Sequence, residues 1–287
     1  MNKMKSYDLA RGIAALNNNY LSLESVIKGF SILYPDDKKL QGLHKLAQDE
    51  LSLVSVIRAL TDFYEKDNIL LTGLINILES HEEHLDPFAE QTIFDAFSIG
   101  QIDSKQWLID TIIDNKMELG ATFICAGWYG TLAAMILENN IDVDFIRSFD
   151  KDPTCAEIAD IINRRWVKDN WKFKASTVDI MDIDYEAPIF GVTKADGVTE
   201  TLGDHPHTVI NTSCEHFSKE DFNKWYWSIP DGCLIILQSN NYKEIKEHVN
   251  CVSSLNEFKT HIMFDELIFE GELQTEKYIR YMLIGYK

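Results

Sequence analysis

The spacing of hydrophobic residues changes once along the chain, near residue 118. Before that point apolar residues recur at steps of three and four, which places them on one face of a helix. One such run comprises Leu40, Leu43, Leu46, Leu51, Val54, Ile57, Leu60 and Phe63. No segment before Gly120 alternates as a strand does. The sequence therefore predicts an all-helical N-terminal domain over residues 1–117.

Two short amphipathic segments, 87–100 and 103–115, close this helical part. Pro87 suits the first turn of a helix, and Gly100 suits its end. Asp103 with Gln106 three residues later matches a capping box. We therefore expect one helix to end near Gly100 and the next to begin at Asp103.

After Gly120 short apolar runs alternate with amphipathic helical segments. The expected strands are 120–127, 143–150, 171–179, 207–213, 233–240, 261–270 and 278–286, and the expected helices are 131–140, 153–170 and 219–229. This alternation is typical of an α/β fold with a mostly parallel sheet covered on both faces. The last two strands have no helix between them, so we expect an antiparallel hairpin at the sheet edge. Residues 186–204 are expected to form a loop-like lid or excursion.

Four segments that can contact a ligand follow the predicted strands at their C-terminal ends, where open α/β sheets bind ligands. The first comprises Ala126, Gly127, Trp128, Tyr129 and Gly130. Glycines there let the backbone approach a ligand closely. The dinucleotide pattern GxGxxG is incomplete, because Cys125 occupies its first glycine position. The alternative is that the glycines only shape the turn.

Two carboxylates follow at the next strand ends. Asp150 lies twenty residues beyond Gly130, the spacing of a βαβ unit, and a carboxylate there accepts hydrogen bonds from both hydroxyls of a ribose. Lys151 is its neighbour. Asp179 ends the third strand and precedes Ile180, a pair suited to the amine and the ring face of an adenine. The alternative for both acids is an ordinary solvated strand end.

The fourth segment runs from Asn211 to Phe217 and includes the Glu215–His216 pair. Asn211 is a candidate positioning residue at the mouth of its strand. His216 is a candidate general base, since the ordinary pKa of histidine, ~6.5, suits proton removal. The pair is as well suited to cap the helix that follows.

This ordered set resembles the class I S-adenosylmethionine-dependent methyltransferases over about Gly120 to Lys287. The matching segments are CAGWYG, SFDKDP, STVDIMDID, INTSCEHF and WYWSIPDGCLIILQSNN. The resemblance implies a Rossmann-like, seven-stranded domain over residues 118–287 that binds S-adenosyl-L-methionine. It places Gly127 and its neighbours at the methionine part, Asp150 at the ribose, Asp179 at the adenine and Asn211 near the sulfonium.

The departures from that family leave the activity open. Cys125 replaces the usual first glycine, and Thr131 follows Gly130 in place of another glycine. The loop and the long helical N-terminus also resemble, more weakly, the nicotianamine-synthase-like enzymes, which transfer the aminocarboxypropyl group of the same cofactor. The expected activity is methyl transfer to a small-molecule acceptor. The alternatives are aminocarboxypropyl transfer and a catalytically inactive cofactor-binding sensor or scaffold.

The net charge of the chain limits the kinds of molecule that it can be expected to bind. The chain has 46 acidic and 27 basic residues, a formal net charge of −19. Such a surface repels phosphate backbones, so a nucleic-acid acceptor is disfavoured. The segment after Ile210 also lacks the Asn/Asp-Pro-Pro-aromatic motif of enzymes that methylate amines of DNA. The helical part is expected to cap the cofactor cleft, or alternatively to form the interface of a homodimer.

The remaining composition favours a cytoplasmic protein without a membrane span or signal peptide. Five scattered cysteines lack CxxC spacing, which predicts reduced thiols and no zinc site. His205, His207 and His216 lack a convergent ligand spacing, so no metal is expected.

Overall fold

The computed structural model describes residue 96 and residues 99–193 and 198–287. The helices expected before residue 96 lie outside this part of the chain. The elements in chain order are α7 (Ile99–Asp114), β1 (Gly120–Cys125), α8 (Thr131–Glu138), β2 (Val143–Asp150), α9 (Cys155–Ile162), α10 (Arg164–Lys168), β3 (Phe173–Thr177), η1 (Ile180–Asp182), β4 (Ile189–Thr193), β5 (Thr199–Gly203), β6 (Thr208–Asn211), η2 (Cys214–His216), α11 (Lys219–Ser228), β7 (Leu234–Asn240), α12 (Leu255–Lys259), β8 (Glu266–Gln274) and β9 (Ile279–Tyr286). No helix among the described residues is long and apolar enough to cross a membrane.

Seven strands form one sheet in the order β3-β2-β1-β6-β7-β9-β8. The first five are parallel, β9 runs antiparallel to β7, and β8 runs antiparallel to β9. The predicted α/β fold with a Rossmann-like, seven-stranded methyltransferase sheet is confirmed. The predicted edge hairpin is confirmed too, with β9 inserted between β7 and the edge strand β8. Chain connections leave β1 and β6 toward opposite sides, so a switch point lies between these strands.

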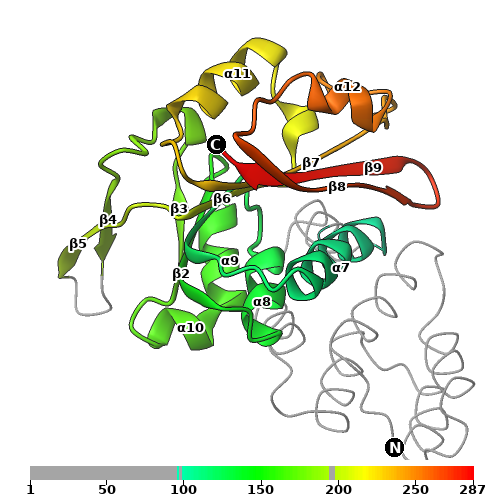
Figure 1. The fold of residues 1–287 in the computed structure, drawn as a ribbon. Helices are drawn as coiled ribbons and strands as arrows, with labels where there is room; N and C mark the ends of the chain where they lie inside the picture. The colour runs from blue at the N-terminus through cyan, green and yellow to red at the C-terminus, as the bar shows by residue number, and fades with distance from the viewer. Residues whose placement is uncertain (1–95, 97–98, 194–197) are drawn as a thin grey trace, which may run out of the picture.

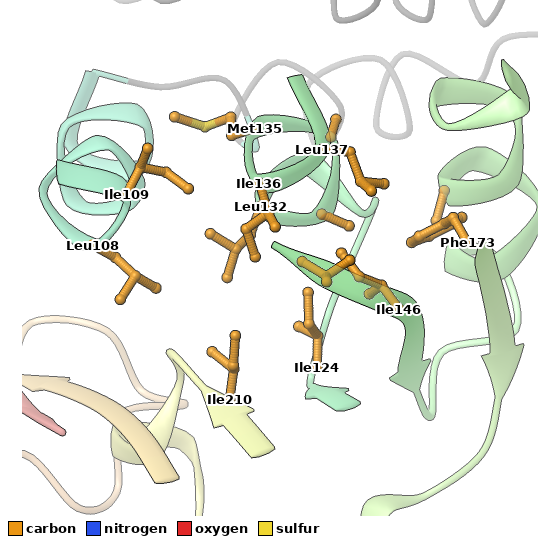
Figure 2. Packing of buried hydrophobic residues seen from close by; sticks show 14 of the residues in the cluster. Leu108, Ile109, Ile124, Leu132, Met135, Ile136, Leu137, Ile146, Phe173 and Ile210 are labelled. Atoms are coloured by element: carbon orange, nitrogen blue, oxygen red, sulfur yellow. The ribbon is translucent and has the colours of Figure 1, made fainter. Parts of the chain in front are cut away.

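Helices cover both faces of the sheet (Figure 1). Side chains alternate along the strands: Ile124 and Ile146 pack with α7, α8 and α9, whereas Phe123 and Phe149 pack in the cluster that contains residues of α11 and α12. Figure 2 shows Leu108 and Ile109 of α7 lying toward the same core as Leu132 and Ile136 of α8. The alternation that predicted the strands is thus the alternation of two buried faces.

The expected helix break at Gly100–Asp103 is wrong, because α7 runs unbroken from Ile99 to Asp114. Ile102, Ile109 and Ile112 are buried along one face, and this packing outweighs the local capping signals. Gly100 is placed where a Cβ would lie 3.1 Å from the Tyr278 hydroxyl. α7 packs in the same core as the sheet. The boundary at residue 117 between a helical and an α/β domain stays a prediction.

Three other segments differ from expectation. The helix expected over 153–170 divides at Asn163, whose buried Nδ2 donates to the carbonyls of Gly130 and Ala159. Residues 186–204 contain the antiparallel pair β4–β5, so the excursion is a hairpin. The strand expected from residue 261 begins at Glu266, because residues 259–262 complete the turns that follow α12.

Candidate functional site

A cavity of about 1050 Å³ opens at the C-terminal ends of the parallel strands. Ala126 follows β1, Asp150 ends β2, Thr212 follows β6 and Asn240 ends β7, and all four line it. The cavity therefore spans the switch point between β1 and β6, where open α/β sheets bind ligands. Residues 100–105 of α7 and the 275–278 turn between β8 and β9 supply the facing wall.

The loop after β1 lines the cavity with Ala126, Gly127 and Trp128. The chain turns sharply there, with positive φ at Ala126 (50°), Trp128 (49°) and Gly130 (70°). A Cβ on Gly127 would lie 2.0 Å from the Ser148 hydroxyl oxygen. The glycine at 127 is therefore required for close packing of the loop on β2, whatever else the loop contacts.

The other two predicted members of this loop do not line the cavity. The Tyr129 side chain is 4% exposed, belongs to the core shared by α8 and α9, and stacks on Trp128 with ring centroids 5.3 Å apart. Gly130 begins α8, and a Cβ there would lie 2.7 Å from Asn163 Nδ2. The prediction of ligand contacts for Tyr129 and Gly130 has no support in this placement, because both residues are turned into the protein.

Asp150 is held at the cavity wall by backbone donors. Its Oδ2 accepts the Trp128 N–H at 2.9 Å, and its Oδ1 accepts the Asp152 N–H at 3.0 Å. Each carboxylate oxygen retains accepting capacity beyond these bonds. Lys151 lines the cavity beside it. The predicted ribose-binding carboxylate is thus oriented before any ligand arrives.

Asp179, the third predicted strand end, also lines the cavity. Its Oδ1 accepts the Met181 N–H at 3.0 Å and so caps the short helix η1. Ile180 and Met181 line the cavity from that helix. The acid and its apolar neighbours are brought together as predicted for an adenine subsite.

Asn211 is placed differently from the prediction. It is fully buried and does not line the cavity, and its Oδ1 accepts the Ser213 N–H at 2.9 Å. The asparagine therefore shapes the turn after β6, because its side chain folds back on the backbone two residues on. The residues that follow it, Thr212, Ser213 and Glu215, do line the cavity.

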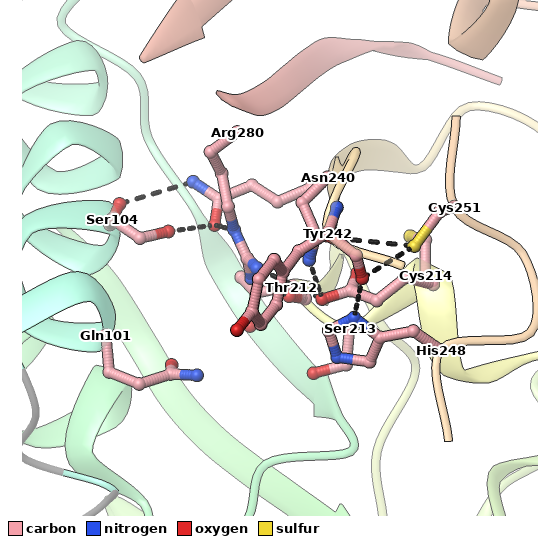
Figure 3. Close-up of polar contacts among 12 residues, drawn as sticks. Gln101, Ser104, Thr212, Ser213, Cys214, Asn240, Tyr242, His248, Cys251 and Arg280 are labelled. Atoms are coloured by element: carbon pink, nitrogen blue, oxygen red, sulfur yellow. Dashed lines mark hydrogen bonds and ion pairs between the residues drawn. The ribbon is translucent and has the colours of Figure 1, made fainter. Parts of the chain in front are cut away.

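A buried ion pair between Glu215 and Arg280 lies next to this turn. Glu215 is 2% exposed, and its Oε1 accepts from Asn240 Nδ2 at 2.6 Å and from Arg280 Nη1 at 3.0 Å. Arg280 also donates to the Thr212 carbonyl through Nη2. Figure 3 shows Arg280 and Asn240 within this network and Gln101 and Ser104 of α7 facing it. The pair ties β9 to the turn that follows β6.

His216 lines the cavity next to Glu215 and is exposed to it. Desolvation by neighbouring protein atoms is the largest influence on its pKa and holds it below the ordinary value. The neighbouring Glu215 carboxylate acts to raise the pKa, whereas His248 and Arg280 lower it further. The imidazole is therefore neutral at pH 7 and available as a proton acceptor.

Lys105 is a candidate site residue that the sequence analysis missed. It lines the cavity from α7, and its Nζ donates to Gln101 Oε1 at 2.7 Å. Burial, together with the charge of Arg280, lowers its pKa to about 7. One signal was present: Lys105 stands on the apolar stripe of α7, between Ile102 and Ile109. A lysine in that position is either buried or directed into a cavity.

No family model matches the sequence, and no curated protein matches it significantly. Among solved structures, the N-methyltransferase NodS from Bradyrhizobium japonicum WM9 is 9% identical over 64% of this chain and 94% of its own, with a TM-score of 0.45. Magnesium protoporphyrin IX methyltransferase (ChlM) from Synechocystis PCC 6803, with bound SAM, is 12% identical over 83% and 99%, with a TM-score of 0.43. A point variant of MtNAS is 12% identical over 99% of both chains, with a TM-score of 0.42.

These likenesses are too distant to assign a reaction or a substrate. We therefore identify the fold from the strand order and strand directions of this chain. We infer its reaction only from the residues that line the cavity.

Proposed function

We propose that this chain transfers the methyl group of S-adenosyl-L-methionine to a small-molecule acceptor. One observation carries the proposal: the Gly127–Trp128 loop, Asp150 and the Asp179–Met181 turn line a single cavity at the switch point of the sheet. These three segments follow the neighbouring strands β1, β2 and β3, which supports contacts with the methionine part, the ribose and the adenine in that order.

The residues fit this cofactor. The Asp150 carboxylate has both oxygens anchored by backbone N–H groups and accepting capacity to spare for two ribose hydroxyls. Asp179, Ile180 and Met181 supply an acceptor and apolar contacts for the adenine. A drug-sized ligand fills a pocket of ~300–1,000 Å³. A cavity of about 1050 Å³ therefore has room for an acceptor beside the cofactor.

When bound, the cofactor supplies an electrophilic methyl sulfonium. The protein must then chiefly align the acceptor, and positioning supplies up to ~7–11 kcal/mol of the barrier. Trp128 lines the cavity, so its aromatic ring is a candidate contact for the cation. His216 and Lys105 are the candidates for removing an acceptor proton, a step worth ~10²–10⁴-fold.

The N-terminal helical part caps the cavity in this proposal. The support is that α7 already contributes Gly100, Gln101, Asp103 and Lys105 to the wall. The rival proposal, a homodimer interface, predicts a dimer by light scattering whose dissociation leaves cofactor binding unchanged.

The test is product analysis after incubation with cofactor labelled in both the methyl and the aminocarboxypropyl groups, with a cell extract as the source of acceptors. Formation of S-adenosylhomocysteine with label in a small molecule supports methyl transfer. Release of methylthioadenosine replaces it with aminocarboxypropyl transfer. Tight cofactor binding without any turnover across extracts contradicts an enzyme and favours a sensor.

A further inference from the structure

Two histidines and a carboxylate converge in the same cavity. Glu215, His216 and His248 each offer a ligand atom, and these atoms all lie within 4.8 Å of one another. We propose that the three side chains bind a divalent transition-metal ion. His205 and His207, which the sequence placed beside His216, are not part of this set.

Glu215 presents an oxygen that its ion pair does not use. Oε1 accepts from both Asn240 and Arg280, whereas Oε2 is buried and has no hydrogen-bond partner among the described residues. A carboxylate held only for the sake of Arg280 would not leave a buried oxygen unsatisfied, since such groups are normally paired. Glu215 lines the cavity and offers a carboxylate oxygen within 4.8 Å of the ligand nitrogens of both histidines, so an ion bound by the three residues would give the carboxylate the further partner that it lacks.

His248 is fixed in the tautomer that a metal requires. Its Nδ1 lies 2.7 Å from the Tyr242 carbonyl oxygen, which only accepts hydrogen bonds, so Nδ1 carries the proton. Nε2 then holds the lone pair. A ring N–H donated to a backbone carbonyl is the usual support of a metal-ligating histidine. Figure 3 shows His248 and Tyr242 together at the edge of the Arg280 network.

The two imidazoles have the mutual geometry of ligands to one ion. Their ring centroids lie 4.7 Å apart at an interplanar angle of 87°. Two imidazoles bound at ~2.0–2.1 Å with N–metal–N angles of about 90–110° have centroids about 4.6–5.3 Å apart. Ligand atoms of such a site lie ~3–3.5 Å from one another, so a side-chain adjustment of about 1 Å closes the set.

The backbone holds the three residues in place. Glu215 and His216 are consecutive in η2, directly after β6. The loop that carries His248 returns to this turn, because the Asn250 N–H donates to the Glu215 carbonyl at 3.0 Å. The Val252 N–H also donates to the Asn240 carbonyl at 3.1 Å.

The charge of the cavity favours a cation. Its lining includes seven carboxylates and four basic side chains. Arg280 opposes a cation most directly, since it contacts Glu215, but that contact is made at the other carboxylate oxygen. Two imidazoles with one carboxylate select Zn²⁺, Co²⁺, Fe²⁺ or Mn²⁺ over Mg²⁺ and Ca²⁺, which prefer oxygen ligands.

Three protein ligands leave coordination positions open toward the cavity. An oxygen or nitrogen of the acceptor would take one of them and so be held near the methyl group. This role rests on the proposed function, whereas the binding of the ion does not. Once His216 ligates the ion it no longer serves as a proton acceptor, so Lys105 is then the remaining candidate base.

The test is titration of the untagged full-length protein, without S-adenosyl-L-methionine, by Co²⁺ absorption and Zn²⁺ calorimetry. We expect one equivalent to bind with visible d–d bands, Zn²⁺ to displace Co²⁺, and Mg²⁺ to fail to do so. His248→Ala and Glu215→Gln should weaken binding by at least about 10-fold. His205→Ala is the matched control, since His205 is exposed and lies outside the cavity, and it should bind as the wild type does.

Absence of stoichiometric binding, or equal loss in His205→Ala and His248→Ala, would overturn the site. If Glu215→Gln fails to fold, His248→Ala decides alone, because His248 lies on a half-buried loop position. A protein that binds the ion but not S-adenosyl-L-methionine would contradict the proposed function and leave the metal site standing.

Discussion

The two walls of the cavity are built in different ways. On the β1–β3 wall the polar side chains are held by nearby backbone: Asp150 by the N–H groups of Trp128 and Asp152, and Asp179 by that of Met181. On the β6–β9 wall they are held by side chains distant in sequence, such as Glu215 by Arg280 and Asn240. The first kind of contact joins residues close in sequence, whereas the second exists only once the fold brings distant residues together.

We expect the largest effect from breaking the buried Glu215–Arg280 ion pair of the β6–β9 wall. Arg280→Met should lower the free energy of unfolding by about 3–5 kcal/mol, because it leaves the buried Glu215 carboxylate without its counter-ion. Equilibrium urea denaturation measures the change. The matched control is Lys259→Met, which removes the basic partner of Glu270 in a far more exposed pair and should cost under about 1 kcal/mol. Equal losses in both variants would contradict the contrast between buried and exposed pairs.

Lys105 of α7, on the facing wall, should make the stability of the protein depend on pH. Burial lowers its pKa to about 7 in the folded protein, from 10.5 when exposed. Below pH 7 both states hold the proton, so folding carries the full cost of burying the charge. As pH rises from 7 to 10.5 only the unfolded state stays protonated, and the cost falls to zero.

Lys105→Met should therefore raise the free energy of unfolding below pH 7. At about 1.4 kcal/mol per unit, the shift from 10.5 to about 7 sets a ceiling of about 5 kcal/mol, and we expect about 2–4 kcal/mol of it to be recovered. The gain should shrink toward pH 10.5, as measured by denaturation at a series of pH values. A gain independent of pH would show that the lysine is not buried as a titrating group.

On the β1–β3 wall, stability is expected to depend on the close packing of the backbone at Gly127. Gly127→Ala should lower the free energy of unfolding by about 1–3 kcal/mol, because the added Cβ would lie 2.0 Å from the Ser148 hydroxyl oxygen. Adding Ser148→Ala should recover part of that loss, since the hydroxyl is the nearest obstacle. Thermal unfolding of the single and double variants measures this, and a lack of recovery would contradict the packing role of Gly127.

The same contrast explains which sequence predictions succeeded. Strand positions were predictable because two buried faces impose alternating or continuous apolar runs, as in VDFIRSFD of β2. Gly100 and Asp103 misled because the core packing of α7 overrides local end signals. Asn211 was placed correctly at a strand end, but its side chain turns back to Ser213, which strand periodicity does not report.

Of the residues that the sequence analysis missed, two share one property. His248 and Arg280 reach the site from loops and strands distant from Glu215 along the chain, and only the topology brings them together. No spacing rule connects such positions, so the metal-binding set was invisible to a search for neighbouring histidines.

Calorimetry with S-adenosyl-L-methionine tests the central claim most directly, with Asp150→Ala compared to Asp144→Ala. Both variants remove one aspartate from β2, but Asp150 lines the cavity and Asp144 is exposed near the other end of the strand. We predict that the wild type binds and that Asp150→Ala weakens binding by about 1.5–3 kcal/mol, roughly 10- to 150-fold. Asp144→Ala should bind as the wild type does. No binding to the wild type, tighter binding of NAD, or equal affinity of the two variants would contradict the account.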